Sequence, residues 1–136
     1  MKKPKKRLPQ EKSITKLKKD LWKIQSICIR RKEGKCFTCN KVYPWKLLQA
    51  GHFEHKECLD FEPKNIHAQC VRCNKHLSGN LGAYADHLEE IYGFGIVQEI
   101  RGQRDKIIRW KVSELEEKIK WYKNAIEELN GDTTHS

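Results

Sequence analysis

The chain has 136 residues, 38% of them hydrophobic and 34% charged, which suffices for one compact domain and excludes two full ones. No apolar run is long enough to cross a bilayer as a helix, so a transmembrane protein is excluded. The basic start MKKPKKRLPQEK continues into further lysines where a signal peptide would become apolar. We therefore expect a cytoplasmic protein without a membrane partner.

The charge of +10 is graded along the chain: residues 1–23 carry +8, residues 24–75 carry +5 and residues 76–136 carry −3. Such a basic field concentrates polyanions, so nucleic acid, ahead of an anionic membrane surface, is the first partner to expect. Plain solubility of a basic domain is the alternative interpretation.

The first half begins with a basic arm and a helix. Residues 1–12 hold five lysines, an arginine and two prolines, and are predicted to be disordered. A helix is then expected to run to about Arg31 and to end at Gly34. Its apolar face recurs in steps of three and four: Ile14, Leu17, Leu21, Ile24 and Cys28.

The middle of the chain predicts short strands and a short helix. The segment KVYPWKLLQAGHFEHK, residues 41–56, is expected to form two short strands in a hairpin or wide loop, with Pro44 at the bend. A helix over YADHLEEIY follows Gly79 and Asn80, and Gly93 and Gly95 should end it. Its inward residues are expected to be Tyr84, Leu88, Ile91 and Tyr92.

A last helix is expected after a connecting segment over residues 96–109. Ser113 and Glu116 have the form of a capping box, and Asn130 with Gly131 should stop the helix before a frayed tail. Its narrow apolar face, like that of the first helix, can pack within the chain or form a homodimer. The residues of this face are Leu115, Ile119, Tyr122, Ile126 and Leu129.

Four of the six cysteines are spaced like metal ligands. CFTC and CVRC, separated by thirty residues, can bring four thiolates around one zinc ion; a redox dithiol and exported disulfides are the alternatives. The predicted structural zinc ligands are Cys36, Cys39, Cys70 and Cys73. Cys28 is expected in the core, and Cys58 has no assigned role.

Three polar residues lie between or directly after these pairs. His52 stands in GHFEH, Asn65 opens NIHAQC, and Asn74 directly follows the fourth cysteine. Zinc that fixed both ends of this segment could bring a strand histidine, a loop asparagine and a residue entering a helix to one place. Ordinary turn, cap and strand roles for these residues are the alternative.

At these residues the sequence resembles the HNH, or ββα-metal, nucleases, and recombination endonuclease VII of phages is similar in the asparagine after its fourth cysteine. It is more similar to the NinG/Rap family of phage recombination nucleases through CFTC, QAGHF, NIHAQCVRCN, LSGN and YADHLEEIYG. The resemblance covers about residues 20–93. It implies an α+β fold: a small zinc-stapled ββα-metal core flanked by long N- and C-terminal helices.

The resemblance also assigns roles. His52 corresponds to the general base, Asn65 to the residue that braces the hairpin, and Asn74 to a ligand of catalytic Mg²⁺ or Mn²⁺. Relatives often carry an aspartate or histidine before the base, where this chain has Gly51. The residues considered as a replacement ligand are Glu54, His55, Asp60 and Asp86.

The residues fit a metal-dependent endonuclease. The resemblance implies that it cuts branched DNA, such as a Holliday junction or D-loop, in phage recombination inside a bacterial host. A non-catalytic zinc-ribbon module that binds nucleic acid or protein is the rival. The expected parts are a basic arm (1–12), the nuclease domain (13–95), a helical region (96–130) and a tail (131–136). Trp45 is a candidate for stacking on bases. The expected phosphate contacts are Lys41, Lys46, Lys56, Arg72 and Lys75.

Overall fold

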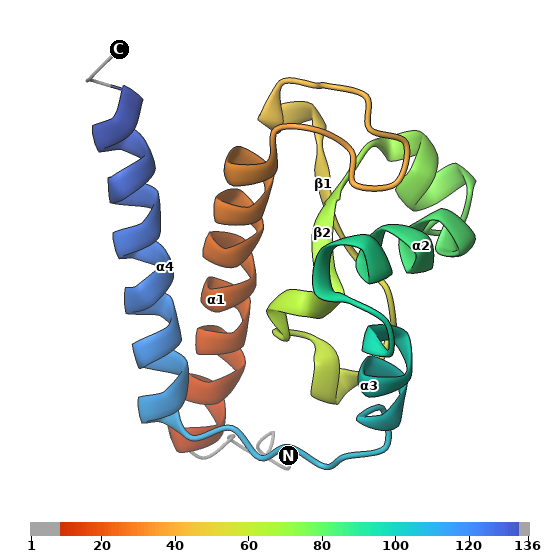
Figure 1. Ribbon diagram of the computed structural model, residues 1–136. Helices are drawn as coiled ribbons and strands as arrows, with labels where there is room; N and C mark the ends of the chain where they lie inside the picture. The colour runs from red at the N-terminus through yellow and green to blue at the C-terminus, as the bar shows by residue number, and fades with distance from the viewer. Residues whose placement is uncertain (1–8, 134–136) are drawn as a thin grey trace, which may run out of the picture. The chain divides into compact units, whose positions relative to one another are not determined.

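The computed structural model describes residues 9–133, and the side chains of residues 13–131 (Figure 1). The predicted arm lies outside the described residues up to position 8. Its last residues are not disordered, because helix α1 spans Pro9–Glu33. A proline suits the first position of a helix, where its missing N–H would have no partner.

The described chain divides into two compact units, one of residues 26–108 and one that joins residues up to Gln25 with those from Arg109 onward. This differs from the predicted division at residues 95 and 96. The zinc-ligand candidates and all the predicted site residues belong to the unit of residues 26–108. Among the residues described, no helix has the length and apolar character needed to cross a membrane.

In the other unit, the first part of α1 pairs with α4, which spans Val112–Thr133. Leu21 and Leu115 are fully buried. Gln25 Nε2 donates a hydrogen bond to the hydroxyl of Tyr122 at 2.9 Å, and the two helices run in the same direction in Figure 1. The apolar faces predicted for the two long helices therefore contribute to a core within one chain.

Both ends of α4 differ from the predictions. The helix begins at Val112, and the carboxylate of Glu114 accepts from the backbone N–H of Lys111 at 3.3 Å, so Ser113 lies inside the first turn. At the other end α4 passes through Gly131, which does not adopt the left-handed conformation that a glycine stop requires. The tail predicted from residue 131 thus starts in helix, and residues 134–136 lie outside the described part.

The unit of residues 26–108 contains one small sheet. Strand β1 (Gln49–His52) pairs antiparallel with β2 (Ile66–Gln69), so that Gln49 lies opposite Gln69 and His52 opposite Ile66. The prediction of two strands within residues 41–56 is wrong: that segment supplies β1 only, after Pro44 and a 3₁₀ turn. All four residues of β2 are buried, so β2 lacks the alternation by which a half-buried strand is recognised.

Helices α2 (Leu81–Tyr92) and α3 (Ile96–Gly102) complete this unit. Gly93, with φ of 96°, follows the last residue of α2 and confirms that the helix ends there, whereas Gly95, also with φ of 96°, precedes the first residue of α3. Ile91 and Tyr92 are 61% and 37% exposed, contrary to the prediction, because α2 ends at Gly93 and its last turn lies at the edge of the core. Tyr84 and Leu88 are fully buried, as predicted.

Two apolar clusters hold the strands and helices of this unit. The larger joins the aromatic residues beside the strands to α2 and α3: Phe37, Phe53, Leu59, Tyr84, Leu88, Ile96, Val97 and Ile100. The smaller surrounds the cysteines: Cys36, Leu48, Ala68, Cys70 and Cys73. Helix α3, which was expected in a separate C-terminal region, thus belongs to the same core as α2. Cys28 is buried, as predicted.

Candidate metal centre and active site

Four cysteines come together where the two CxxC segments meet. The sulfurs of Cys36, Cys39, Cys70 and Cys73 all lie within 4.8 Å of one another, and those of Cys39 and Cys70 are 3.9 Å apart. Sulfurs about 2.3 Å from a tetrahedral zinc ion are about 3.8 Å from one another, so the cluster can hold zinc. All six cysteines are free thiols, and the disulfide alternative is not realised.

Tight turns place the thiols of each pair on one side. In the first turn, the N–H of Asn40 donates to the carbonyl of Cys36 at 2.9 Å, and Asn40 has a positive φ of 64°. In the second, the N–H of Cys73 points at the sulfur of Cys70 at 3.5 Å. Such N–H groups favour thiolates, which are the form that binds metal.

The thiols differ in acidity before any metal binds. Burial disfavours the Cys36 thiolate, but hydrogen bonds from the Thr38 hydroxyl and from backbone N–H groups outweigh it and lower the pKa to about 6. Burial, reinforced by the neighbouring Cys36 sulfur, raises the pKa of Cys39 to about 12. A cation is therefore needed to ionise the whole cluster at neutral pH.

Asn65 fixes the long connection between β1 and β2. Its side chain is fully buried; Oδ1 accepts from the N–H of Glu54 at 2.8 Å, and Nδ2 donates to the carbonyls of Glu54 and Leu59. The backbone joins in, since the N–H of Phe53 donates to the Asn65 carbonyl at 2.9 Å. These contacts make Asn65 the brace of the segment that follows His52.

Tyr84 of α2 holds the peptide that leads into His52. Its hydroxyl donates to the carbonyl of Gly51 at 2.7 Å and lies 3.4 Å from that of Asn65. Burial raises the pKa of Tyr84 well above its ordinary value, so the hydroxyl keeps its proton at neutral pH. Helix α2 thereby fixes the end of β1 and the start of β2 at their backbone carbonyls.

Tyr84→Phe is expected to lower the free energy of unfolding by about 1–3 kcal/mol, because two buried carbonyls lose a hydroxyl donor while the ring still fills the core. Urea titration of the zinc-loaded protein measures this loss. An unchanged midpoint would show that the hydroxyl does not support the hairpin.

His52 is the last residue of β1, and its ring is held on one side. Nε2 lies 2.9 Å from the carbonyl oxygen of Asp60. A carbonyl only accepts, so Nε2 donates this hydrogen bond, and in the tautomer that donates from Nε2 the lone pair is on Nδ1. An imidazole held through one nitrogen can take up a proton at the other, which is the chemistry that the predicted general base requires.

Asn74 lies in the π-helical turn Arg72–His76, which includes Cys73, the last residue of the second cysteine pair. Its Nδ2 donates to Gln49 Oε1 at 2.8 Å. Its Oδ1 lies 2.9 Å from the point that a Cβ on Gly51 would occupy, immediately before His52. The fold therefore brings Asn74 to the strand position that precedes the predicted base.

His52 and Asn74 approach β1 from different sides. Successive side chains of a strand point to opposite faces, so the face of Gly51 that meets Asn74 is not the face on which His52 projects. The His52 ring contacts the connection at Asp60, whereas Asn74 contacts Gln49. The two predicted residues thus share one strand end without touching each other.

None of the residues considered as a replacement ligand contacts Asn74 through a hydrogen bond described here. The Glu54 carboxylate accepts from Arg101 Nε at 3.1 Å. His55 and Asp86 are exposed, and it is the carbonyl of Asp60 that meets His52. Among the described histidine, cysteine and acidic residues, the four-cysteine cluster is the only group of three or more that could hold a metal ion.

All five predicted phosphate contacts are exposed side chains: Lys41, Lys46, Lys56, Arg72 and Lys75. Trp45 is half-buried beneath three cations, with Arg30 at 5.2 Å, Arg31 at 5.9 Å and Lys46 Nζ at 5.8 Å from its ring. We name Arg30, Arg31, Trp45 and Lys46 the cationic–aromatic patch. The two arginines add to the positive surface that the five predicted residues supply.

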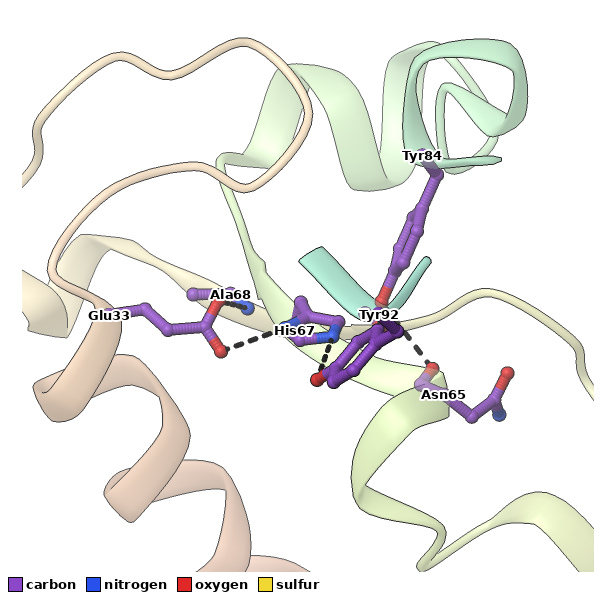
Figure 2. Close-up of polar contacts among 7 residues, drawn as sticks. Glu33, Asn65, His67, Ala68, Tyr84 and Tyr92 are labelled. Carbon is purple, nitrogen blue, oxygen red and sulfur yellow. Dashed lines mark hydrogen bonds and ion pairs between the residues drawn. The ribbon is translucent and has the colours of Figure 1, made fainter. Parts of the chain in front are cut away.

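A partly buried polar network ties the end of α1 to β2 and α2 (Figure 2). Glu33 accepts from the N–H of Ala68 at 3.0 Å and from His67 Nδ1 at 3.1 Å. His67 Nε2 lies within hydrogen-bond distance of the Tyr92 hydroxyl, at 3.2 Å, and the His67 ring stacks on Phe37. Sequence reasoning missed this network, because Glu33 and His67 lie far apart in the chain, although His67 stands in the NIHAQC motif.

Comparison with known proteins identifies the family of the chain. The family model described as "Bacteriophage Lambda NinG protein" matches residues 1–132. The chain belongs to the NinG family. NinG proteins from Salmonella phage P22 and Escherichia phage lambda are 33% and 29% identical to it over 74% and 79% of its length, respectively. A NinG protein of Enterobacteria phage H19B is 40% identical over 48% of it.

The chain spans about half the length of the first two NinG proteins, with 50% and 53% of them covered, and a third of the last. Each of these relatives is named only "Protein ninG". No solved structure matches the chain. The NinG family membership is therefore established by sequence, while the chemistry has to be argued from the site.

Proposed function

We propose that this chain is a metal-dependent DNA endonuclease in which His52 activates water for phosphodiester hydrolysis. The observation that carries the proposal is the hairpin end: Nε2 of His52 is fixed on the Asp60 carbonyl, and Asn74 meets the preceding residue, Gly51. The cysteine cluster, Asn65 and Tyr84 hold this end in place. The core is then HNH-like, as the sequence resemblance implies.

The opposed directions of His52 and Asn74 suit the reaction. In-line displacement at phosphorus places the attacking water and the leaving oxygen on opposite sides of the phosphate. Nδ1 of His52 can take the proton of the water on one side of the strand end. A divalent cation at Asn74, Mg²⁺ or Mn²⁺, would supply stabilisation of the negative charge that develops on the leaving oxygen.

The charge of the surface supports DNA as the substrate. The exposed lysines and arginine and the cationic–aromatic patch belong to the same unit as the hairpin. Such residues contact phosphates and position a duplex without reading its sequence. A preference for branched DNA in phage recombination follows from the family resemblance alone, and a homodimer would be the simplest way to cut two strands of a junction.

A non-catalytic zinc module that binds nucleic acid is the second candidate. It is favoured by the lack, within residues 13–131, of any acidic or histidine cluster beside Asn74 that could hold a catalytic metal. In that case the hairpin would serve only as a scaffold for the basic surface.

Incubation of the zinc-loaded chain with labelled four-way junction, flap and linear duplex, in Mg²⁺ or in EDTA, separates the two candidates. The endonuclease is expected to cut branched substrates faster than linear duplex, and only in Mg²⁺. Equal binding in both conditions with every strand intact would favour the zinc module.

Lys75, next to Asn74, provides a test of the DNA surface. Lys75→Gln is expected to weaken DNA binding and to reduce the slope of log affinity against log salt by about 0.9, the contribution of one phosphate contact. Lys106→Gln, at another exposed lysine of the same unit, is the matched control and should leave the slope unchanged. DNA binding is measured by fluorescence anisotropy over a range of salt concentrations. If Lys75→Gln and Lys106→Gln have the same salt slope, Lys75 does not contact a phosphate.

A further inference from the structure

Gly51 lies against a side chain that fills the space where its own would be. An ideal Cβ on Gly51 would come too close to Gln69 Oε1 for any real side chain, and within 2.9 Å of Asn74 Oδ1. Two carboxamide oxygens thus lie within 3 Å of one point. This point is where a side chain directly before His52 would begin.

The Gln69 side chain cannot turn its oxygen elsewhere. Its Nε2 donates to the carbonyl of Gly79 at 2.8 Å and to the hydroxyl of Thr38 at 3.1 Å, and Gln69 is fully buried. The Gly79 carbonyl only accepts, so the Gln69 amide must turn its nitrogen toward Gly79. Its oxygen, Oε1, therefore faces Gly51. Thr38 in turn lies beside Cys36, which links this orientation to the cysteine cluster.

Gln69 Oε1 has no hydrogen-bond partner among the residues that the structure describes. A buried acceptor without a partner is unfavourable and calls for an explanation such as a bound ion. Asn74 points its oxygen the same way, because its Nδ2 is engaged by Gln49 Oε1. Two fixed carbonyl oxygens that face one point are a suitable pair of ligands for a hard cation.

We propose that Gln69 supplies, through Oε1, the second protein ligand of a divalent cation held beside Asn74. This inference rests on the proposed function and identifies the ligand that the Gly51 position lacks. Glycine is needed there because a larger residue would displace the Gln69 oxygen. Both ligands are neutral, so the cation binds weakly to the chain alone and more tightly when a DNA phosphate adds negative charge.

Localisation of Mn²⁺ by NMR tests this without reference to catalysis. Substoichiometric Mn²⁺ added to the zinc-loaded, ¹⁵N-labelled chain broadens signals near the ion. We expect the strongest broadening at the amides of Gly51, Gln69 and Asn74. Broadening centred on Glu54, His55 or Asp60 would overturn the proposal, even if the chain cuts DNA.

Variants supply the second readout, the Kd for Mn²⁺ measured by EPR. Gln69→Met, which keeps the volume and removes the oxygen, should raise the Kd at least about tenfold. The double variant Gly51→Asp with Gln69→Ala replaces the Gln69 oxygen with a carboxylate on residue 51 of β1. It should restore Mn²⁺ binding. The control Gln25→Met changes another fully buried glutamine, which lies in the other unit, and should not alter the Kd.

The outcomes are distinct from those of the nuclease test. An unchanged Kd in folded Gln69→Met would contradict the role of Gln69 and leave the endonuclease in place. If Gln69→Met does not fold, the wild-type broadening map and the double variant decide the question. If the chain binds Mn²⁺ at this site but never cuts DNA, the metal site stands and the proposed function is contradicted.

Discussion

His52→Ala is expected to lower the rate of Mg²⁺-dependent DNA cleavage by about 10²–10⁴-fold, the usual contribution of a general base. The ring makes its described hydrogen bond to the Asp60 carbonyl at the strand end, outside the cysteine cluster and the apolar core. Zinc content, circular dichroism and DNA affinity should therefore stay close to those of the wild type. Single-turnover cleavage of a labelled junction measures the rate.

His55→Ala is the matched control, because His55 is an exposed histidine three residues further along, with its ring 5.9 Å from that of His52. It should cleave at nearly the wild-type rate. Equal loss in both variants would indicate a general effect on the connection, and full activity of His52→Ala would contradict the assignment of the base.

Cys70→Ser is expected to unfold the unit of residues 26–108. Four-thiolate zinc sites contribute on the order of 10 kcal/mol of folding free energy in small domains, and a serine hydroxyl does not replace a thiolate. Cys70 stands directly after β2 and touches the same apolar cluster as Cys36 and Leu48. Loss of zinc should thus release both the strand and the turn that carries Asn74.

Cys58→Ser separates this effect from that of losing any thiol. Cys58 is half-buried, and its sulfur donates to the carbonyl of Gln103 at 3.0 Å, a hydrogen bond that a serine hydroxyl can replace. The control should keep its zinc and its thermal transition. A Cys70→Ser protein with native circular dichroism and no zinc would refute the cluster as the clamp of this fold.

Features set by neighbouring residues could be predicted from the sequence. The CxxC spacing places two thiols in one turn whatever the rest of the chain does, and the four sulfurs do come together. Gly34, with φ of 61° and its N–H bonded to Arg30, ends the first helix as predicted. The mixed helix and strand fold class was expected from the family resemblance, and the structure has both helices and a two-stranded sheet.

Features that depend on distant pairing could not be predicted in the same way. β1 pairs across the connection to β2, whose buried residues show no alternation, so the partner strand had no local signal. The contact between the Gln69 side chain and Gly51 exists only because the strand register brings the two residues to the same face of the sheet. Likewise, Glu33 reaches His67 through the end of a helix, a contact that no spacing rule describes.

The most direct test of the central claim is analysis of the DNA ends produced by the zinc-loaded chain. Hydrolysis with a 3′ leaving oxygen predicts fragments with 3′-hydroxyl and 5′-phosphate ends, formed in Mg²⁺ and absent in EDTA or with His52→Ala. A junction that is bound by the purified chain in Mg²⁺ and recovered with every phosphodiester bond intact would contradict the account.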